Sequence, residues 1–351
     1  MVCNNPLYID DVEYVSALPL EWDKLTGKNF LISGASGMIG SFLIDVLMMR
    51  SQGIKIHALG RNIESANARF HDYAGNDCFR FTAFDINEPL EDFGGIYDFV
   101  LHLASNTHPR AYSADPVGTI TANIIGLNNM LKFSLEHGTE RFVFASSVEV
   151  YGENKGDTEY FTEDYCGNID LSKARSGYCE AKRCGETLCQ SYIQQYGLDV
   201  VIPRFSRTYG PTMKMDDTKA ISQFIRKGAA HEDIVLKSEG TQLFSYSYVA
   251  DSVSGLLTVL LSGENGTAYN IADTKSDITL RELAGIVADY SGKKVIFELP
   301  DETERRGYSP ASKAIMDASR IKSLGWSSRY DIKAGITRTL DIISDSILLD
   351  Y

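Results

Sequence analysis

The sequence predicts an α/β protein in which a doubly wound parallel sheet is followed by a smaller α/β domain. Short apolar runs alternate with longer segments whose apolar residues recur every three or four positions, which is typical of strands alternating with helices. A glycine-punctuated turn joins the first such strand to the first such helix. No repeat or low-complexity linker divides the 351 residues, so we expect the two halves to pack together.

The first strand, turn and helix carry a nucleotide-binding pattern. Phe30, Leu31 and Ile32 form the apolar run of a strand buried on both faces. The glycines after it relieve backbone strain, let main-chain N–H groups approach a pyrophosphate, and let the helix pack on the strand. The helix N-terminus favours the phosphates. The predicted cofactor-binding residues here are Gly34, Ser36, Gly37, Met38, Ile39 and Gly40. The alternative is a glycine-rich turn without a ligand.

Further strands are predicted at residues 54–59, 79–84, 97–103 and 141–145, separated by helical segments. Ligands of such sheets bind beyond the carboxyl ends of the strands. That rule adds Arg61, Asp85, Ile86, Leu103, Ala104 and Ser105 to the predicted cofactor-binding residues. Arg61 replaces the acidic residue that would bind the ribose of NAD, so it favours NADP. The alternative is a solvent-exposed arginine that stacks near the adenine.

The domain boundaries follow from the same pattern. We expect residues 1–26 to form an N-terminal extension on the surface and residues 27–203 to form the sheet domain. Residues 204–351 should form mainly the smaller domain, from which residues 244–272 return to the sheet domain. In the smaller domain, helices are predicted at 220–229 and after a Thr279 cap.

Composition excludes several classes of partner. The formal net charge of −13 argues against nucleic acid and anionic membranes. No apolar run approaches the ~20 residues of a membrane-spanning helix, so we expect a soluble cytoplasmic protein. The six cysteines include no C-x-x-C pair and the six histidines are scattered. We therefore predict buried thiols and no metal site.

Tyr178 and Lys182 are four residues apart and share one helix face. An ammonium beside a phenol favours the phenolate and lowers a pKa that starts near ~10, which is how a tyrosine becomes a general base. Ser147, at the end of the fifth strand, is placed to hydrogen-bond the same hydroxyl. The alternative is an ordinary surface tyrosine and lysine on an amphipathic helix.

These motifs resemble the extended short-chain dehydrogenase/reductase superfamily, in particular the NAD-dependent epimerase/dehydratase family of nucleotide-sugar enzymes. Residues 102–105, 115–117, 126–131, 147–152, 182–188 and 208–211 are similar to the UDP-glucuronate decarboxylase branch. The resemblance implies that Tyr178 takes a proton from a sugar hydroxyl while hydride passes to the nicotinamide. It also implies that Lys182 holds the nicotinamide ribose, that Asn123 completes the proton relay, and that the Rossmann-like domain binds NAD.

The resemblance further implies a transient 4-keto sugar to which the hydride returns. A sugar with a carboxylate at C5 loses CO₂, and a sugar with a hydroxyl at C6 can lose water. A sugar that does neither is epimerised at C4 when the hydride returns. Glu149 matches a glutamate of decarboxylases and 4,6-dehydratases, whereas Val148 replaces an aspartate of dTDP-glucose dehydratases. We therefore predict a decarboxylase, with a 4-epimerase or 4,6-dehydratase as the alternative. Alternation with Val148 and Val150 in a strand would point Glu149 to the opposite face; alternatively, it forms only a salt bridge.

Two positions depart from the decarboxylase pattern. Arg207 replaces an asparagine that contacts the substrate diphosphate, and Phe244 replaces an arginine. We expect Arg305 and Arg306 to compensate, although adjacent arginines are also typical of a solvated turn. The predicted substrate-binding residues are Tyr112, Arg204, Arg207, Arg305 and Arg306.

Two more remote interpretations remain. A cofactor-sensing binding protein without turnover would not need Ser147, Tyr178 and Lys182. A net reductase that consumes NADPH would fit Arg61. The segments at 115–135 and 174–196 resemble helices that form the dimer interface of the family, so a homodimer is expected.

Overall fold

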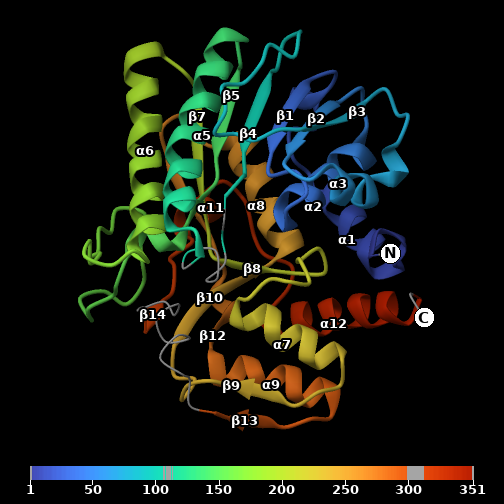
Figure 1. Cartoon of the computed structure of the whole chain (residues 1–351), viewed down its shortest axis with the longest axis vertical. Helices are drawn as coiled ribbons and strands as arrows, with labels where there is room; N and C mark the ends of the chain where they lie inside the picture. The colour runs from blue at the N-terminus through green and yellow to red at the C-terminus, as the bar shows by residue number, and fades with distance from the viewer. Residues whose placement is uncertain (1, 106, 108–111, 113, 299–311, 350–351) are drawn as a thin grey trace.

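The structure is a computed structural model that describes residues 2–105, 107, 112, 114–298 and 312–349. It has two layered units (Figure 1): a larger one built on a long parallel sheet, and a smaller one below it built on short sheets and helices. Among the described residues, no helix has the length and apolar character needed to cross a lipid bilayer.

The large sheet confirms the predicted fold class. Its order is β11-β7-β5-β4-β1-β2-β3, with a short β6 beside β7, and every pairing is parallel. The strands are β1 (Asn29–Ser33), β2 (Lys55–Gly60), β3 (Phe79–Ala83), β4 (Phe99–His102), β5 (Arg141–Phe144), β6 (Ser146–Ser147), β7 (Val200–Phe205) and β11 (Ala268–Ile271). The strand order reverses between β1 and β4, which is where ligands bind in doubly wound sheets.

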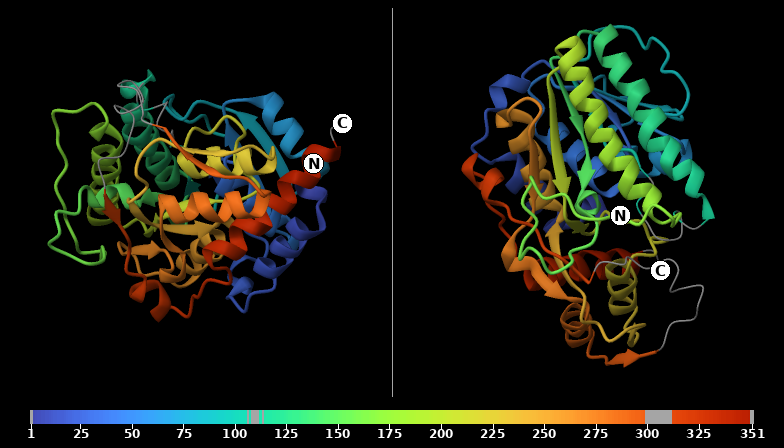
Figure 2. Two further views of the ribbon diagram at one scale, coloured as in Figure 1. Left: turned by 90° about the horizontal axis from the view of Figure 1, so that it is seen from below. Right: turned by 90° about the vertical axis from the view of Figure 1, so that its left-hand side faces the viewer.

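Helices cover both faces of this sheet. One face packs against α2 (Met38–Arg50) and α8 (Val249–Ser262), and the other against α5 (Pro116–Glu136) and α6 (Ser176–Tyr196), which run side by side (Figure 2). Phe30 belongs to the core on the α2 side, whereas its neighbour Leu31 belongs to the core on the α5 side. Burial of both faces explains the continuous apolar run of β1. After β2 and before β3 come α3 (Ile63–Arg69) and η3 (His71–Tyr73).

The smaller unit contains a sheet of order β12-β10-β14, in which β8 also pairs with β10, and a separate β9-β13 pair. These strands are β8 (Arg207–Tyr209), β9 (Ile234–Leu236), β10 (Leu243–Tyr248), β12 (Asp277–Thr279), β13 (Val295–Phe297) and β14 (Lys313–Ala314). The helices are α7 (Ala220–Ala229), α9 (Leu280–Ser291) and α12 (Ile332–Leu349). The helix predicted at 220–229 and the Thr279 cap are confirmed, the latter as a capping box with Glu282.

One predicted boundary is wrong. Residues 244–248 do not return to the large sheet, because β10 is the centre of the smaller sheet. Only α8 and β11 return, followed later by α11 (Ser319–Ser323), which packs on both of them, while η5 (Thr274–Ser276) leads into β12. The first boundary is also shifted: β7 stays in the large sheet to Phe205, so the smaller unit begins at β8.

The N-terminal extension forms η1 (Val2–Asn4), α1 (Pro6–Ser16) and η2 (Trp22–Leu25). Asn5 caps α1 by accepting the N–H of Leu7, and Pro6 occupies the first turn, where its missing N–H has no cost. Its apolar side chains join the main core, and α1 packs against α2, α8 and α12. The extension therefore touches both units, which the sequence alone did not indicate.

Candidate active site

The glycine loop after β1 is shaped for close backbone approach. Gly34 has a φ of +72°, and a Cβ there would lie 2.7 Å from the backbone of Leu103 and Ala104. A Cβ on Gly40 would lie 2.5 Å from the carbonyl oxygen of Gly34. Gly37 is the N-cap of α2, so the free N–H groups of the first helical turn, which includes Met38 and Ile39, face this loop. These residues fit a dinucleotide pyrophosphate.

The other predicted cofactor-binding residues follow the carboxyl ends of neighbouring strands. Arg61 follows β2, Asp85 and Ile86 follow β3, and Leu103 to Ser105 follow β4. Ser105 Oγ donates to Asn123 Oδ1 at 3.0 Å, and Asn123 is completely buried in α5, where its Nδ2 donates to the carbonyl oxygen of Thr119. The fold therefore brings the predicted relay residue Asn123 to the same edge of the sheet as the glycine loop.

Tyr178 and Lys182 lie on the face of α6 that meets β5 and β6. Lys182 Nζ lies 5.9 Å from the centre of the Tyr178 ring and donates to the carbonyl oxygen of Ala145 at 2.7 Å. Burial lowers the pKa of Lys182 to about 7. Burial also raises the pKa of Tyr178, and a hydrogen bond with Ser147 offsets only part of that rise. The predicted lowering of the phenol pKa by the ammonium is therefore wrong for this arrangement, because burial dominates.

Glu149 lies beside this pair. Glu149 belongs to η4 (Val148–Tyr151), a 3₁₀ turn. The predicted alternation of side chains along a strand is therefore wrong at this position. Its carboxylate is 3.0 Å from Arg175 Nη2 and 3.6 Å from Arg207 Nη2, and it accepts from Cys179 Sγ at 3.4 Å. Burial by itself would raise the pKa of Glu149, but the two guanidinium groups lower it below its usual range. Glu149 is therefore a carboxylate at neutral pH.

Aromatic rings support both arginines. The guanidinium of Arg175 lies 4.5 Å from the centre of the Tyr112 ring, which in turn lies 5.0 Å from the Tyr178 ring. The guanidinium of Arg207 lies 3.6 Å from the centre of the Phe244 ring. The two departures from the decarboxylase pattern are thus in direct contact. Arg175 was missed by the sequence analysis, although its position one helical turn before Tyr178 was a usable signal.

Arg204, predicted to contact the substrate, is bonded to several groups of the protein itself. Its guanidinium donates to both carboxylate oxygens of Glu186, to Tyr151 Oη and to the carbonyl oxygen of Glu163, at 2.6 to 2.9 Å. These bonds tie β7 to α6. The substrate contact of Arg204 stays a prediction. Arg305 and Arg306 lie outside the described residues.

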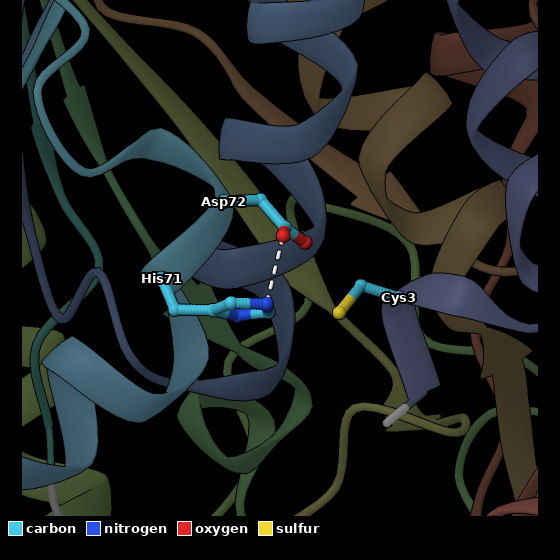
Figure 3. Close-up of side chains that lie close together, drawn as sticks. All are labelled: Cys3, His71 and Asp72. Carbon is cyan, nitrogen blue, oxygen red and sulfur yellow. Dashed lines mark ion pairs between the residues drawn. The ribbon is translucent and has the colours of Figure 1, made fainter.

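One group of potential metal ligands is present in the described part of the chain. Cys3, His71 and Asp72 place their ligand atoms within 4.8 Å of one another, where the N-terminal extension lies against η3 (Figure 3). The His71 imidazole already pairs with the Asp72 carboxylate at 2.7 Å. Burial raises the pKa of Cys3, which disfavours the thiolate that a metal would need. We assign this group no role in the site.

A doubly wound sheet with a glycine loop, and a tyrosine and lysine one helical turn apart at the same edge, define a short-chain dehydrogenase/reductase. Residues 30–272 match the NAD dependent epimerase/dehydratase family, and the chain belongs to that family.

The chain is similar along most of its length to proteins named UDP-glucuronic acid decarboxylase. The chain is 33% identical over 325 residues to UDP-glucuronic acid decarboxylase 6 of Arabidopsis thaliana, covering 91% of this chain and 90% of the relative. It is 30% identical over 322 residues to UDP-glucuronic acid decarboxylase 1 of Danio rerio, covering 90% and 73%.

Solved structures agree on the fold. The dTDP-glucose 4,6-dehydratase of Streptomyces venezuelae, solved with NAD bound, superposes with a TM-score of 0.78 at 23% identity, over 92% of this chain and 98% of that chain. The UDP-glucuronic acid 4-epimerase of Bacillus cereus, solved with UDP-glucuronic acid and NAD, gives 0.76 at 22% identity, over 91% and 99%.

Proposed function

We propose that this protein is an NAD-dependent nucleotide-sugar decarboxylase that acts on UDP-glucuronate through a transient 4-keto sugar. The observation that carries the proposal is the grouping of Ser147, Tyr178 and Lys182 at the same edge of the sheet as the glycine loop, with an ionised Glu149 next to them. The decarboxylases among the relatives support this choice of reaction.

In this proposal Tyr178 acts as a phenolate, which the positive charges of bound NAD and Lys182 would favour against the effect of burial. Its Oη accepts the proton of the C4 hydroxyl, and Ser147 orients the tyrosine. Bound NAD would supply the hydride acceptor for C4 and return the hydride at the end. Lys182 Nζ, now bonded to the Ala145 carbonyl oxygen, would hold the ribose hydroxyls and steady the tyrosine. Asn123, bonded to Ser105, would complete the proton path on the α5 side.

The chemistry balances without an external reductant. Oxidation at C4 makes the C5 carboxylate a β-keto acid, the C5–carboxylate bond breaks with its electrons left on the sugar, and CO₂ leaves. A proton then adds at C5 and the hydride returns to C4. The net reaction converts UDP-glucuronate and one proton into a UDP-pentose and CO₂.

Dehydration is the weaker alternative. It needs an acid to protonate a departing hydroxyl, and Val148 has no proton to give while Glu149 is ionised. Epimerisation at C4 needs no such acid, so it remains the second candidate.

The decisive experiment is a mass-spectrometric product screen of the purified protein with NAD or NADP and UDP-glucuronate, UDP-glucose, dTDP-glucose or GDP-mannose. Loss of the mass of CO₂ from UDP-glucuronate alone is the expected result, and Tyr178→Phe should abolish it. Loss of water from a hexose donor would assign a dehydratase. An unchanged mass with a new NMR spectrum would assign an epimerase, and stoichiometric use of NADPH a reductase. Binding of cofactor without any turnover would favour a sensing protein.

The cofactor preference and the assembly belong to the same proposal. Arg61 follows β2 and favours the 2′-phosphate of NADP, whereas the family as a whole is NAD dependent. We expect turnover with NAD, and a rate that is higher with NADP would reverse this choice. The exposed apolar side chains of α5, including Val117 at 69% exposure and Ile125 at 44%, support a homodimer through α5 and α6. A monomer by light scattering would refute it.

A further inference from the structure

Among the residues that the structure describes, the charges around Glu149 do not cancel. Two guanidinium groups, those of Arg175 and Arg207, lie against the single carboxylate of Glu149, which leaves one positive charge in excess in this part of the chain. The three side chains are only 14%, 18% and 18% exposed, in the order Arg175, Arg207 and Glu149. An uncompensated charge is costly where water is largely excluded, so this arrangement favours an additional anion.

The hydrogen-bond inventory also indicates an additional acceptor. Arg175 Nε and Arg207 Nη1 are buried and have no hydrogen-bond partner among the residues that the structure describes. Buried polar groups are otherwise almost always paired, and an unpaired one costs free energy. The two free N–H groups come from arginines on either side of the same carboxylate. They are therefore placed to donate to one ligand.

Phe244 explains how the Arg207 guanidinium is held. Tyr246 of β10 is the register partner of Arg207 in β8, so Phe244, two residues before Tyr246, lies diagonally across on the same face. The guanidinium rests 3.6 Å from the centre of the Phe244 ring. Stacking on the ring fixes the planar group without using its N–H donors. The smaller unit thereby presents a cation to Glu149 of the larger unit.

The Arg175 and Arg207 guanidinium groups lie near Tyr178, where the sugar of a substrate would react. Glu149 and Arg175 both lie close enough to shift the pKa of Tyr178, and Tyr112 bridges the Arg175 guanidinium and the Tyr178 ring. An anion bound between Arg175 and Arg207 would therefore be on the sugar that Tyr178 acts on.

We propose that Arg207, with Arg175, binds a carboxylate on the sugar of the substrate, and that Arg207 is the residue that selects acidic sugars over neutral ones. The inference rests on the proposed function at the same site. A carboxylate at C5 of the sugar would bring the four charged groups to neutrality and accept from the unpaired N–H groups. A neutral hexose would leave the excess charge and the unpaired donors in place.

The anion has a second possible source, the diphosphate of the nucleotide, and the test separates the two. Binding is measured by calorimetry in the Tyr178→Phe background, which removes turnover, with UDP-glucuronate, UDP-glucose and UDP. We expect UDP-glucuronate to bind about 10- to 100-fold more tightly than UDP-glucose, as a charge-assisted hydrogen-bonded pair would give. Adding Arg207→Met should remove this difference and leave the UDP affinity unchanged.

Two variants control this result. Arg207→Lys keeps the charge but loses the planar fork, so part of the preference should remain. Arg281→Met removes another arginine that stacks on a phenylalanine, Phe297, in the same unit, and should leave the preference intact. Thermal unfolding of each variant verifies that it is folded.

The outcomes are distinct. Equal weakening of all three ligands by Arg207→Met would assign Arg207 to the diphosphate and overturn the inference, as would equal affinities for UDP-glucuronate and UDP-glucose before the substitution. If the unsubstituted protein turns over no nucleotide sugar while the binding preference and its loss are observed, the proposed reaction fails and the inference stands.

Discussion

Glu149 and Asp11 are both carboxylates beside arginines and tyrosines, Asp11 buried and Glu149 18% exposed, yet the hydrogen bonding around them differs in completeness. Asp11 is completely buried in α1 and accepts from Tyr248 Oη at 2.6 Å, Tyr330 Oη at 2.7 Å and Arg338 Nε at 2.7 Å. Arg338 Nη2 donates in turn to the carbonyl oxygen of Leu7. Around Glu149, by contrast, two arginines share one carboxylate, and each retains an N–H group with no partner among the described residues.

The difference separates a structural network from a candidate binding site. The Asp11 network connects α1 to β10 and α12 of the smaller unit. One helical turn earlier in α1, Tyr8 donates to Asp45 of α2, which Arg69 and Tyr73 also contact, in the larger unit. Since these donors and acceptors are matched, the N-terminal extension fastens the two units together. The surplus donors around Glu149 have no such structural use and remain available to a ligand.

The largest expected effect is on turnover. Tyr178→Phe removes the proposed general base, so the rate of cofactor reduction with saturating nucleotide sugar should fall about 10²- to 10⁴-fold. The unfolding temperature should change little, because the aromatic ring and its contact with Tyr112 remain. Tyr330→Phe is the matched control in the Asp11 network: it should lower stability and leave the rate at low temperature intact. A Tyr178→Phe protein with normal activity would end the catalytic assignment.

Asp11→Ala should lower stability and leave turnover intact, which is the opposite of the result expected for Tyr178→Phe. Removing one partner of a buried, hydrogen-bonded pair leaves Arg338 without its buried counter-charge and with only the half-exposed Asp10, and the free energy of unfolding should fall by about 3–5 kcal/mol. Turnover measured well below the unfolding temperature should be retained.

Asp10→Ala provides the comparison for Asp11→Ala. Asp10 also pairs with Arg338 but is about half exposed, so its loss should cost about 0–1 kcal/mol. Chemical denaturation measures both values, and equal losses would contradict the assignment of Asp11 as the buried anchor.

The two carboxylates should also differ in the sign of their pH dependence. The arginines lower the pKa of Glu149, so its ion pairs stabilise the fold above the ordinary pKa of a glutamate and are lost as the pH falls through the lowered value. Burial raises the pKa of Asp11, so its contribution is greatest below the ordinary pKa of an aspartate and declines as the pH rises through the raised value.

Thermal unfolding between acidic and neutral pH tests this opposition. The stability difference between the unsubstituted protein and Glu149→Gln should shrink on acidification, whereas the corresponding difference for Asp11→Asn should shrink as the pH rises. If the stability differences of the two variants changed with pH in the same direction, the environments of Glu149 and Asp11 would not differ in this way.

Local patterns in the sequence were sufficient to predict much of the fold. The apolar runs of β1 and β5 and the glycines around Gly37 are short-range signals, because a strand buried on both faces and a tight strand-to-helix turn constrain consecutive residues. The boundary at residue 244 failed for the opposite reason: β10 is as buried as a strand of the large sheet, so its sequence cannot tell which sheet it joins.

The cluster around Glu149 could not be found in this way. Glu149 lies in a 3₁₀ turn, Arg175 precedes α6, Arg207 lies in β8 and Phe244 in β10, so their contact depends on how the two units pack. The sequence indicated that Arg207 and Phe244 were unusual, but only the β8-β10 register shows that one rests on the other. Tyr178 and Lys182 were predictable because one helix fixes their relationship.

The smallest expected loss of stability concerns a hydrogen-bonded pair that is exposed to solvent. Thr279 and Glu282 form a capping box at the start of α9, where each side chain accepts from the backbone of the other, in an exposed position. Thr279→Ala should lower the free energy of unfolding by about 1 kcal/mol and leave turnover and sugar preference unchanged. The Asp11 network is equally saturated but buried, so its loss should cost several times more. If denaturation gives similar losses for Thr279→Ala and Asp11→Ala, burial does not govern the strength of the N-terminal connection.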